Sequence, residues 1–157
     1  MTLLARDIMV EDYDTIHKDG SLDDAIGIIL NGKVRETGHK TVSVMVLDDF
    51  NKLAGVITMY DILYHLRPSF LNRGISGDEL DWGGQLKYCM KHLKEKSVSQ
   101  VMSPHLTGAS PDEHLMVILD RMVKNKYRRL PVLENGKPVG IVYLSDIYYH
   151  LFNRSHG

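Results

Sequence analysis

Two stretches of the chain, GVITMYDIL at residues 55–63 and GIVYLSDIY at residues 140–148, carry the same signature. Each consists of a glycine, two β-branched apolar residues, three further residues and the pair Asp-Ile. The second copy begins 85 residues after the first. Because an internal repeat is the sequence mark of a structural unit used more than once, the signature predicts two copies of one small fold.

An amphipathic helix is predicted before each signature. The apolar residues there recur at i, i+3, i+4, i+7 and i+8, a spacing that places them on one face of a helix. They are Leu22, Ala25, Ile26, Ile29 and Leu30 in the first copy and Leu115, Ile118, Leu119, Met122 and Val123 in the second. Ser21 with Asp24, and Ser110 with Glu113, form Ser-x-x-acid capping boxes that predict where the two helices begin.

A pair of strands is predicted between each helix and its signature. The strands cover residues 42–46 and 53–58 in the first copy and residues 129–133 and 139–144 in the second. Asn135-Gly136 between the latter two is a strong hairpin-turn signal. With a short helix after each signature, each copy reads strand–helix–strand–strand–helix. The predicted fold class is therefore α+β (α/β), with two copies that bury their sheets against each other.

Composition is that of an ordinary globular protein. The 157 residues suffice for one domain or for two small repeats packed as one body. Nineteen Lys and Arg against 20 Asp and Glu give a net charge of -1, which argues against a nucleic-acid partner. The single cysteine, Cys89, excludes an internal disulfide and a cysteine-based zinc site, and it fits a reducing cytosol. A cytoplasmic location without a membrane partner is expected, because no apolar run approaches the ~20 residues that span a bilayer.

The segment between the copies, residues 68–96, matches neither of them. Its apolar residues Leu86, Met90 and Leu93 predict a helix. The lysines on a neighbouring face fit a solvated helix face better than an anion-binding strip, given the net charge near zero. The predicted division is a first repeat at 1–67, a linker at 68–96 and a second repeat at 97–157.

The tandem signatures, with the Arg-Leu-Pro-Val strand at residues 129–132, resemble a pair of CBS (cystathionine-β-synthase) domains, an arrangement called a Bateman module. The usual family signature is Gly-apolar-apolar-Thr/Ser-x-x-Asp, which Thr58 and Asp61 meet in full. In the second copy Asp146 is present, but Tyr143 stands where Thr or Ser is expected. The resemblance implies two CBS repeats packed sheet to sheet with pseudo-two-fold symmetry.

The resemblance also implies a stand-alone regulatory module with no enzymatic activity and no required cofactor. CBS pairs commonly bind AMP, ADP, ATP or S-adenosylmethionine in clefts between the repeats and signal by a conformational change. A carboxylate at a helix start accepts ribose hydroxyl groups, and cations hold phosphates. The alternative is a structural dimerisation module with degenerate, non-binding clefts, which Tyr143 and Ser43 favour.

Two ligand clefts follow from the resemblance, each built from both copies. The residues expected in the first are Thr58 and Asp61 for ribose, residues 102–107 with Ser103 and His105 for the base, and His39 and Lys40 for phosphate. Those expected in the second are Ser145 and Asp146 for ribose, Arg128 and Arg129 for phosphate, and the region of Met9, Val10 and Tyr13 for adenine. The two aspartates are equally well explained as helix N-caps.

The two clefts are not equivalent in sequence. About seven extra residues separate helix and strand in the first copy, within Asn31–Lys40. In that register Ser43 stands where the second copy has Arg129, which weakens phosphate binding in the first cleft unless Lys40 compensates. Tyr143 either blocks ribose in the second cleft or supplies the missing hydrogen bond with its phenol.

Other classes of function find little support. The sequence has no glycine-rich phosphate loop or Cys-His pair in a convincing context, and its eight histidines are too scattered to predict a metal site. A homodimer is expected through the helices after the signatures, unless their apolar residues complete the internal core. These residues are Leu63, Tyr64, Leu66, Tyr148, Tyr149, Leu151 and Phe152. The regulated partner would then be an unidentified protein.

Overall fold

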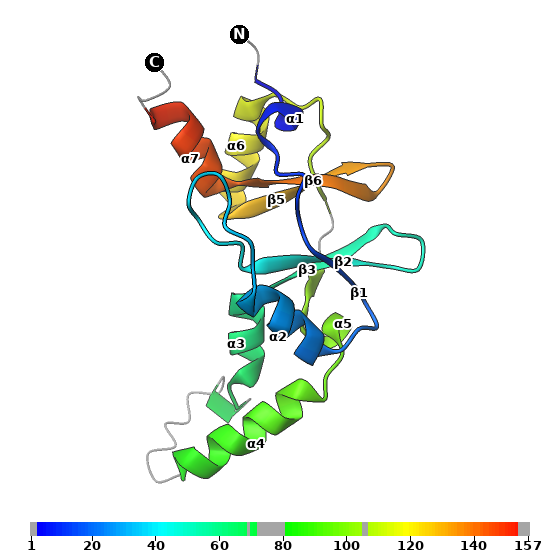
Figure 1. Cartoon of the computed structure of the whole chain (residues 1–157), viewed down its shortest axis with the longest axis vertical. Helices are drawn as coiled ribbons and strands as arrows, with labels where there is room; N and C mark the ends of the chain where they lie inside the picture. Colours follow the sequence, from blue (N-terminus) through cyan, green and yellow to red (C-terminus); the bar gives the residue numbers. More distant parts are fainter. Residues whose placement is uncertain (1–2, 69, 72–80, 105–106, 154–157) are drawn as a thin grey trace.

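The computed structural model describes residues 3–68, 70–71, 81–104 and 107–153. Two sheets meet in the middle of the molecule, and helices cover their outer faces (Figure 1). On one side are α1 (Ala5–Ile8), α6 (Leu115–Asn125) and α7 (Leu144–Phe152). On the other are α2 (Leu22–Leu30), α3 (Met59–Leu66), α5 (Val98–Val101) and, further out, α4 (Trp82–Lys94).

The first sheet has four strands in the order β1-β2-β3-β4. They are β1 (Thr15–His17), β2 (Ser43–Leu47), β3 (Leu53–Thr58) and β4 (Ser103–Pro104), with β1 parallel to β2 and the other pairs antiparallel. The second sheet is the hairpin of β5 (Arg129–Glu134) and β6 (Lys137–Tyr143). Single bridges extend it at Ala109 beside β5 and at Val10 beside β6. The two sheets share one plan, which confirms the predicted repeat and the α+β fold.

The pairing within the two hairpins fixes the correspondence between the copies. Ser43 lies opposite Thr58 in the first hairpin, and Arg129 lies opposite Tyr143 in the second. The predicted register, with Ser43 in the place of Arg129, is therefore confirmed. Thr58 and Tyr143 are equivalent by the same pairing, and the aspartates three residues later begin equivalent helices.

The helices that precede the two hairpins, α2 and α6, begin differently. Ser21 caps α2 as predicted, since its Oγ accepts the backbone N–H of Asp24 at 3.1 Å. The start predicted for α6 at Ser110 is wrong, because the helix begins at Leu115 with His114 as its N-cap. Ser110 and Glu113 do share a hydrogen bond of 2.9 Å, but they form a turn before the helix. The N-terminal segment holds this turn in place, because Leu4 and His114 form an antiparallel bridge.

Each copy's core is completed by a short helix from elsewhere in the sequence. Ala5 and Ile8 of α1 are buried with residues of α6, β5 and β6. Val98 and Val101 of α5 are buried with residues of α2, β2 and β3. The short helices α1 and α5 are thus exchanged between the two copies.

A third buried cluster joins the two sheets. It consists of Met45, Val56, Ile141 and Tyr143. The backbone N–H of Leu53 also donates to the carbonyl of Gly136 at 2.9 Å, which ties the two hairpins together. These contacts confirm the predicted sheet-to-sheet packing.

The extra residues of the first copy form a hairpin-like loop, which we call the arm (residues 31–42). Val34 and Lys40 are bridged across it, and Gly38 lies at its tip with a φ of 90°, a conformation that suits glycine. Figure 1 shows the arm in light blue, rising from the end of α2 to the base of α7. The arm therefore crosses from the first copy to the second.

The segment between the two copies holds α4, whose 13 residues make it the longest helix in the described ranges. Within those ranges, no helix combines the length and apolar character needed to cross a bilayer.

Candidate functional site

The first cleft is a cavity of about 620 Å³ between the two copies. Thr58 and Asp61 line it at the start of α3, and Ser103 lines it from β4. Residues 126–128, which join α6 to β5, and Arg129 at the start of β5 form the opposite wall. The cleft thus brings together the carboxylate of one copy and the guanidinium groups of the other.

Asp61 is held in place by its own helix start. Its Oδ2 accepts hydrogen bonds from the backbone N–H of Thr58 at 2.9 Å and from the Thr58 hydroxyl at 3.1 Å. Its Oδ1 accepts a hydrogen bond from the exposed Ser103 hydroxyl at 2.9 Å. Because a carboxylate has about four acceptor positions, Asp61 keeps capacity for a ligand hydroxyl group.

Arg129 lies on the opposite wall with an unsatisfied donor. Its Nε is buried and has no hydrogen-bond partner among the described residues. Burial lowers the pKa of its guanidinium, and the neighbouring charges of Arg128 and Arg35 lower it further. Tyr143 and Asp61 raise it. Because arginine stays protonated in proteins and a buried unpaired N–H is costly, this group is suited to an anionic acceptor.

The second cleft is arranged differently, because Asp146 is engaged by the arm. The Nε of Arg35 donates to the Asp146 carboxylate at 3.1 and 3.3 Å, and the Thr37 hydroxyl donates to it at 2.8 Å. The Arg35 and Asp146 side chains are 7% and 5% exposed. A second guanidinium nitrogen of Arg35 donates to the Ser145 hydroxyl at 3.1 Å.

The ring of Tyr143 packs against the guanidinium of this ion pair. The ring is buried, and the Arg35 guanidinium carbon lies 3.7 Å from the ring centre. This is a cation–π contact. In this structure Tyr143 is thus a platform for Arg35.

Arg35 divides the second cleft into two cavities. One, of about 320 Å³, is lined by Asp146 together with Met9 and Val10. The other, of about 520 Å³, is lined by Ser145, Tyr143 and the two arginines at the start of β5. Arg35 lines both. The predicted second cleft, which required all these residues around one ligand, is therefore interrupted.

Two of the residues predicted for the first cleft, His39 and Lys40, lie elsewhere. Lys40 and His39 line the 520 Å³ cavity and not the first cleft, because the arm carries them toward α7. The Lys40 amino group donates to the carbonyl of Leu30 at 2.7 Å. Arg128 and Arg129 line both the first cleft and this cavity, so the two spaces adjoin at β5. His105 lies outside the described residues.

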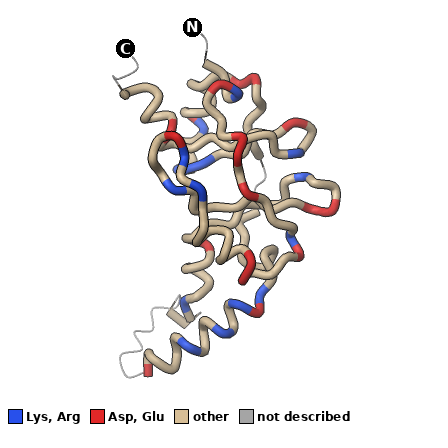
Figure 2. Tube along the Cα trace, viewed as in Figure 1, with Lys and Arg blue, Asp and Glu red and all other residues tan. Residues whose placement is uncertain are grey.

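Sequence reasoning missed Arg35 and Thr37 as site residues. Their partner Asp146 lies more than 100 positions away, so no local pattern connects them. The available signal was the surplus of residues between helix and strand in the first copy. Figure 2 shows Lys and Arg positions, in blue, gathered where the arm meets the second sheet.

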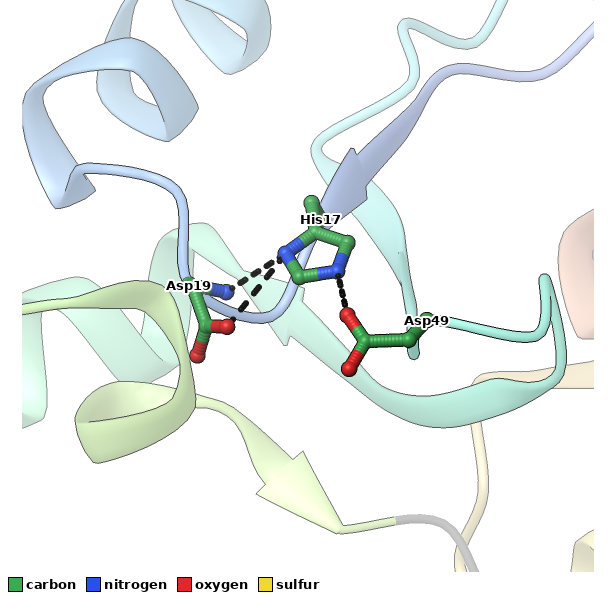
Figure 3. Close-up of side chains that lie close together, drawn as sticks. All are labelled: His17, Asp19 and Asp49. Atoms are coloured by element: carbon green, nitrogen blue, oxygen red, sulfur yellow. Dashed lines mark hydrogen bonds and ion pairs between the residues drawn. The ribbon is translucent and has the colours of Figure 1, made fainter.

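One cluster of possible metal ligands lies apart from the clefts. His17, Asp19 and Asp49 approach within 4.8 Å of one another on the exposed ends of β1 and the β2–β3 turn (Figure 3). The two aspartates contact different ring nitrogens of His17. Nε2 lies 2.7 Å from Asp49, while Nδ1 accepts the backbone N–H of Asp19 at 3.1 Å. These hydrogen bonds explain the arrangement of the three side chains, which are all exposed.

The chain is similar to known proteins over most of its length. The CBS domain family model matches residues 5–68 and 98–153. The uncharacterised protein MJ1225 of Methanocaldococcus jannaschii is 26% identical over 141 residues, which are 90% of this chain and 40% of that protein. The chain thus spans well under half the length of that relative.

Solved structures share the fold. CBSX2 from Arabidopsis thaliana, a CBS-pair protein, has a TM-score of 0.73 at 21% identity, with 100% of this chain and 99% of that chain covered. CBSX2 in complex with AMP has a TM-score of 0.69 at 23% identity, with 96% and 97% covered. The CBS domain pair of MJ0100, in complex with 5′-methylthioadenosine and S-adenosyl-L-methionine, has a TM-score of 0.67 at 22% identity, with 99% of both chains covered.

Proposed function

Because this chain belongs to the CBS domain family and carries two CBS domains in tandem, we propose that it is a regulatory module that binds an adenosine-containing ligand in its first cleft. Pairs of this family are generally regulatory and non-catalytic. The complexes of CBSX2 with AMP and of MJ0100 with S-adenosyl-L-methionine support this class of ligand.

The observation that carries the proposal is the pairing of Asp61 and Arg129 across one cavity. The carboxylate would accept a hydroxyl group of the ribose, and Ser103 would give up its bond to Asp61 or donate to the same sugar. The unpaired Nε of Arg129 would donate to a phosphate or carboxylate of the ligand.

A longer phosphate chain would extend toward the arm. The first cleft shares its β5 wall with the 520 Å³ cavity, where His39 and Lys40 lie. A second or third phosphate would therefore leave Arg129 and approach these side chains. AMP, ADP and ATP would all use the same ribose position.

Isothermal titration calorimetry with AMP, ATP, S-adenosylmethionine and adenosine tests this proposal. We expect at least one of these compounds to bind the wild-type protein, and Asp61→Ala to weaken its binding at least tenfold. Asp120→Ala is the matched control, because Asp120 is an exposed aspartate paired with Lys124 on α6. Absence of binding by all four compounds would refute the proposal.

The second candidate function is a structural dimerisation module that binds no ligand. The ion pair of Arg35 with Asp146 favours it, because one ribose position is already filled by the chain itself. Under this alternative Asp61 serves only as the partner of Thr58 in the capping box of α3, and no adenosine compound would shift the thermal unfolding of the wild-type protein. Any saturable shift that Asp61→Ala removes would rule this alternative out.

We also propose a homodimer formed through α3 and α7. Five of the apolar residues expected there are exposed, while Leu66 and Tyr149 are half-buried. The exposed residues are Leu63, Tyr64, Tyr148, Leu151 and Phe152. Large apolar side chains left exposed on two equivalent helices are the kind of surface that an interface covers.

Analytical ultracentrifugation tests the dimer. The wild-type protein should sediment as a dimer, and Tyr148→Asp should shift it to a monomer. Phe50→Asp, on the exposed β2–β3 turn, is the control that should leave the dimer intact. A monomeric wild-type protein would refute the proposed dimer. The cytoplasmic location and the partner protein stay predictions from the sequence.

A further inference from the structure

We propose that Arg35 is a built-in occupant of the second cleft, so that each chain offers one open adenosine site, at the first cleft. The inference rests on the proposed function, because it concerns the number and place of the ligands that such a module accepts. It is carried by the contacts of the arm.

Arg35 takes the groups that a ribose would need in the second cleft. Its guanidinium donates to both oxygens of Asp146 and to the hydroxyl of Ser145. These are the carboxylate and hydroxyl that the second signature supplies. A ribose hydroxyl group and the Arg35 guanidinium would compete for these acceptors, because each donates hydrogen bonds to the same carboxylate.

The arm holds Arg35 in this place from several sides. The backbone N–H of Arg35 donates to the carbonyl of His39 at 2.8 Å, and the guanidinium donates to the carbonyl of Lys40 at 3.3 Å. The ring of Tyr143 lies under the guanidinium at 3.7 Å. The Arg35 side chain is thus buried, and each of its three guanidinium nitrogens donates a hydrogen bond, unlike those of a surface arginine that samples many positions.

The occupied volume supports the same conclusion. Arg35 separates the 320 Å³ cavity beside Met9 and Val10 from the 520 Å³ cavity beside Arg129. A nucleotide whose base and phosphates lay in these two spaces would have to pass through the guanidinium. Binding in the second cleft therefore requires Arg35 to leave Asp146.

Among the described residues, no side chain fills the first cleft in this way. The connection between α6 and β5, which corresponds to the arm, consists only of residues 126–128. Lys126 ends α6 in the left-handed conformation, and β5 begins three residues later. This connection is too short to reach into the opposite copy, and Asp61 meets the exposed Ser103 instead. The difference between the clefts therefore follows from the length of one loop.

Calorimetric stoichiometry tests the inference with the compound that binds the wild-type protein most tightly. We expect one ligand per chain for the wild type and none for Asp61→Ala. We expect two for Arg35→Ala, and one for the double variant Arg35→Ala/Asp61→Ala. Arg121→Ala is the matched control, because it removes another partly buried arginine ion pair, with Glu113, outside both clefts. It should keep one ligand per chain.

The outcomes separate the inference from the proposed function. Two ligands per wild-type chain, or one per chain in a folded Arg35→Ala variant, would overturn the role of Arg35 and leave the adenosine site standing. No ligand on any of the proteins would overturn both. Should Arg35→Ala fail to fold, Arg35→Gln keeps part of the hydrogen bonding without the charge. The number of ligands bound per chain is then measured for this variant and compared with the same expected values.

Discussion

Each of the two clefts contains an aspartate from the same position of the repeat, but the two aspartates have different partners. Asp61 and Asp146 stand at equivalent positions of the repeat, yet Asp61 is half-buried and faces a cavity, while Asp146 is buried in an ion pair. Besides the arm, the residue three positions earlier also differs between the copies. Thr58 bonds its own aspartate through a capping box, whereas Tyr143 makes no side-chain cap. A signature therefore supplies the carboxylate, and the neighbouring residues decide what the carboxylate binds.

The largest expected difference between the clefts is in stability. Asp146→Ala should lower the free energy of unfolding by about 3–5 kcal/mol, because it leaves the buried charge of Arg35 without a partner. Asp61→Ala should cost about 0.5–2 kcal/mol, the value of a helix cap. Urea denaturation of the two variants measures both values. Equal losses would contradict the assignment of Asp146 to a structural ion pair.

A smaller effect, on ligand affinity, is expected for Arg129, which lines both the first cleft and the 520 Å³ cavity. Arg129→Met should weaken the binding of AMP or ATP about 10- to 150-fold, since it removes a charge-assisted hydrogen bond of about 1.5–3 kcal/mol. Binding of uncharged adenosine should not change. Titration calorimetry with AMP and adenosine, each on the wild type and the variant, makes this comparison.

The same variant should fold at least as stably as the wild type. An apolar side chain in place of a buried, incompletely bonded charge is often neutral or stabilising. A loss of AMP binding together with a large loss of stability would show that Arg129 is needed for the fold and not for the ligand.

The smallest effects are expected for the hydroxyl partners of the two aspartates. Thr37→Val should lower the free energy of unfolding by about 1 kcal/mol, because it removes a hydrogen bond to the buried Asp146. Ser103→Ala should change stability less, because Ser103 is exposed, and should instead alter ligand affinity. Thermal unfolding with and without AMP distinguishes the two. Equal stability losses in both variants would weaken the contrast between the clefts.

The fold could be predicted from the sequence because its signals are local and occur twice. The signatures, the hairpin turn at Asn135 and the helix cap at Ser21 each lie within a few residues of what they specify. The predicted start of α6 was wrong because a contact with Leu4 keeps the residues around His114 out of the helix.

The candidate site was only partly predictable for the same reason. Thr58, Asp61 and Ser103 do lie together, because a helix start and the neighbouring strand position them. The position of Arg35 depends on where a loop crosses between the copies. The length of that loop can be counted from the sequence, but the residue it delivers to Asp146 is fixed only by the packing of two distant segments.

The exchange of α1 and α5 between the copies makes the two halves of the chain interdependent. A cut in the linker between α3 and α4 would yield two fragments, each lacking a short helix of its own core and carrying the one its partner needs. Neither fragment should be stable alone, whereas a mixture should reassemble by mutual complementation. Ser103, which lines the cleft around Asp61, also lies only two residues after the end of α5. A small molecule bound between the copies, as proposed above, would therefore stabilise both halves of the chain at once.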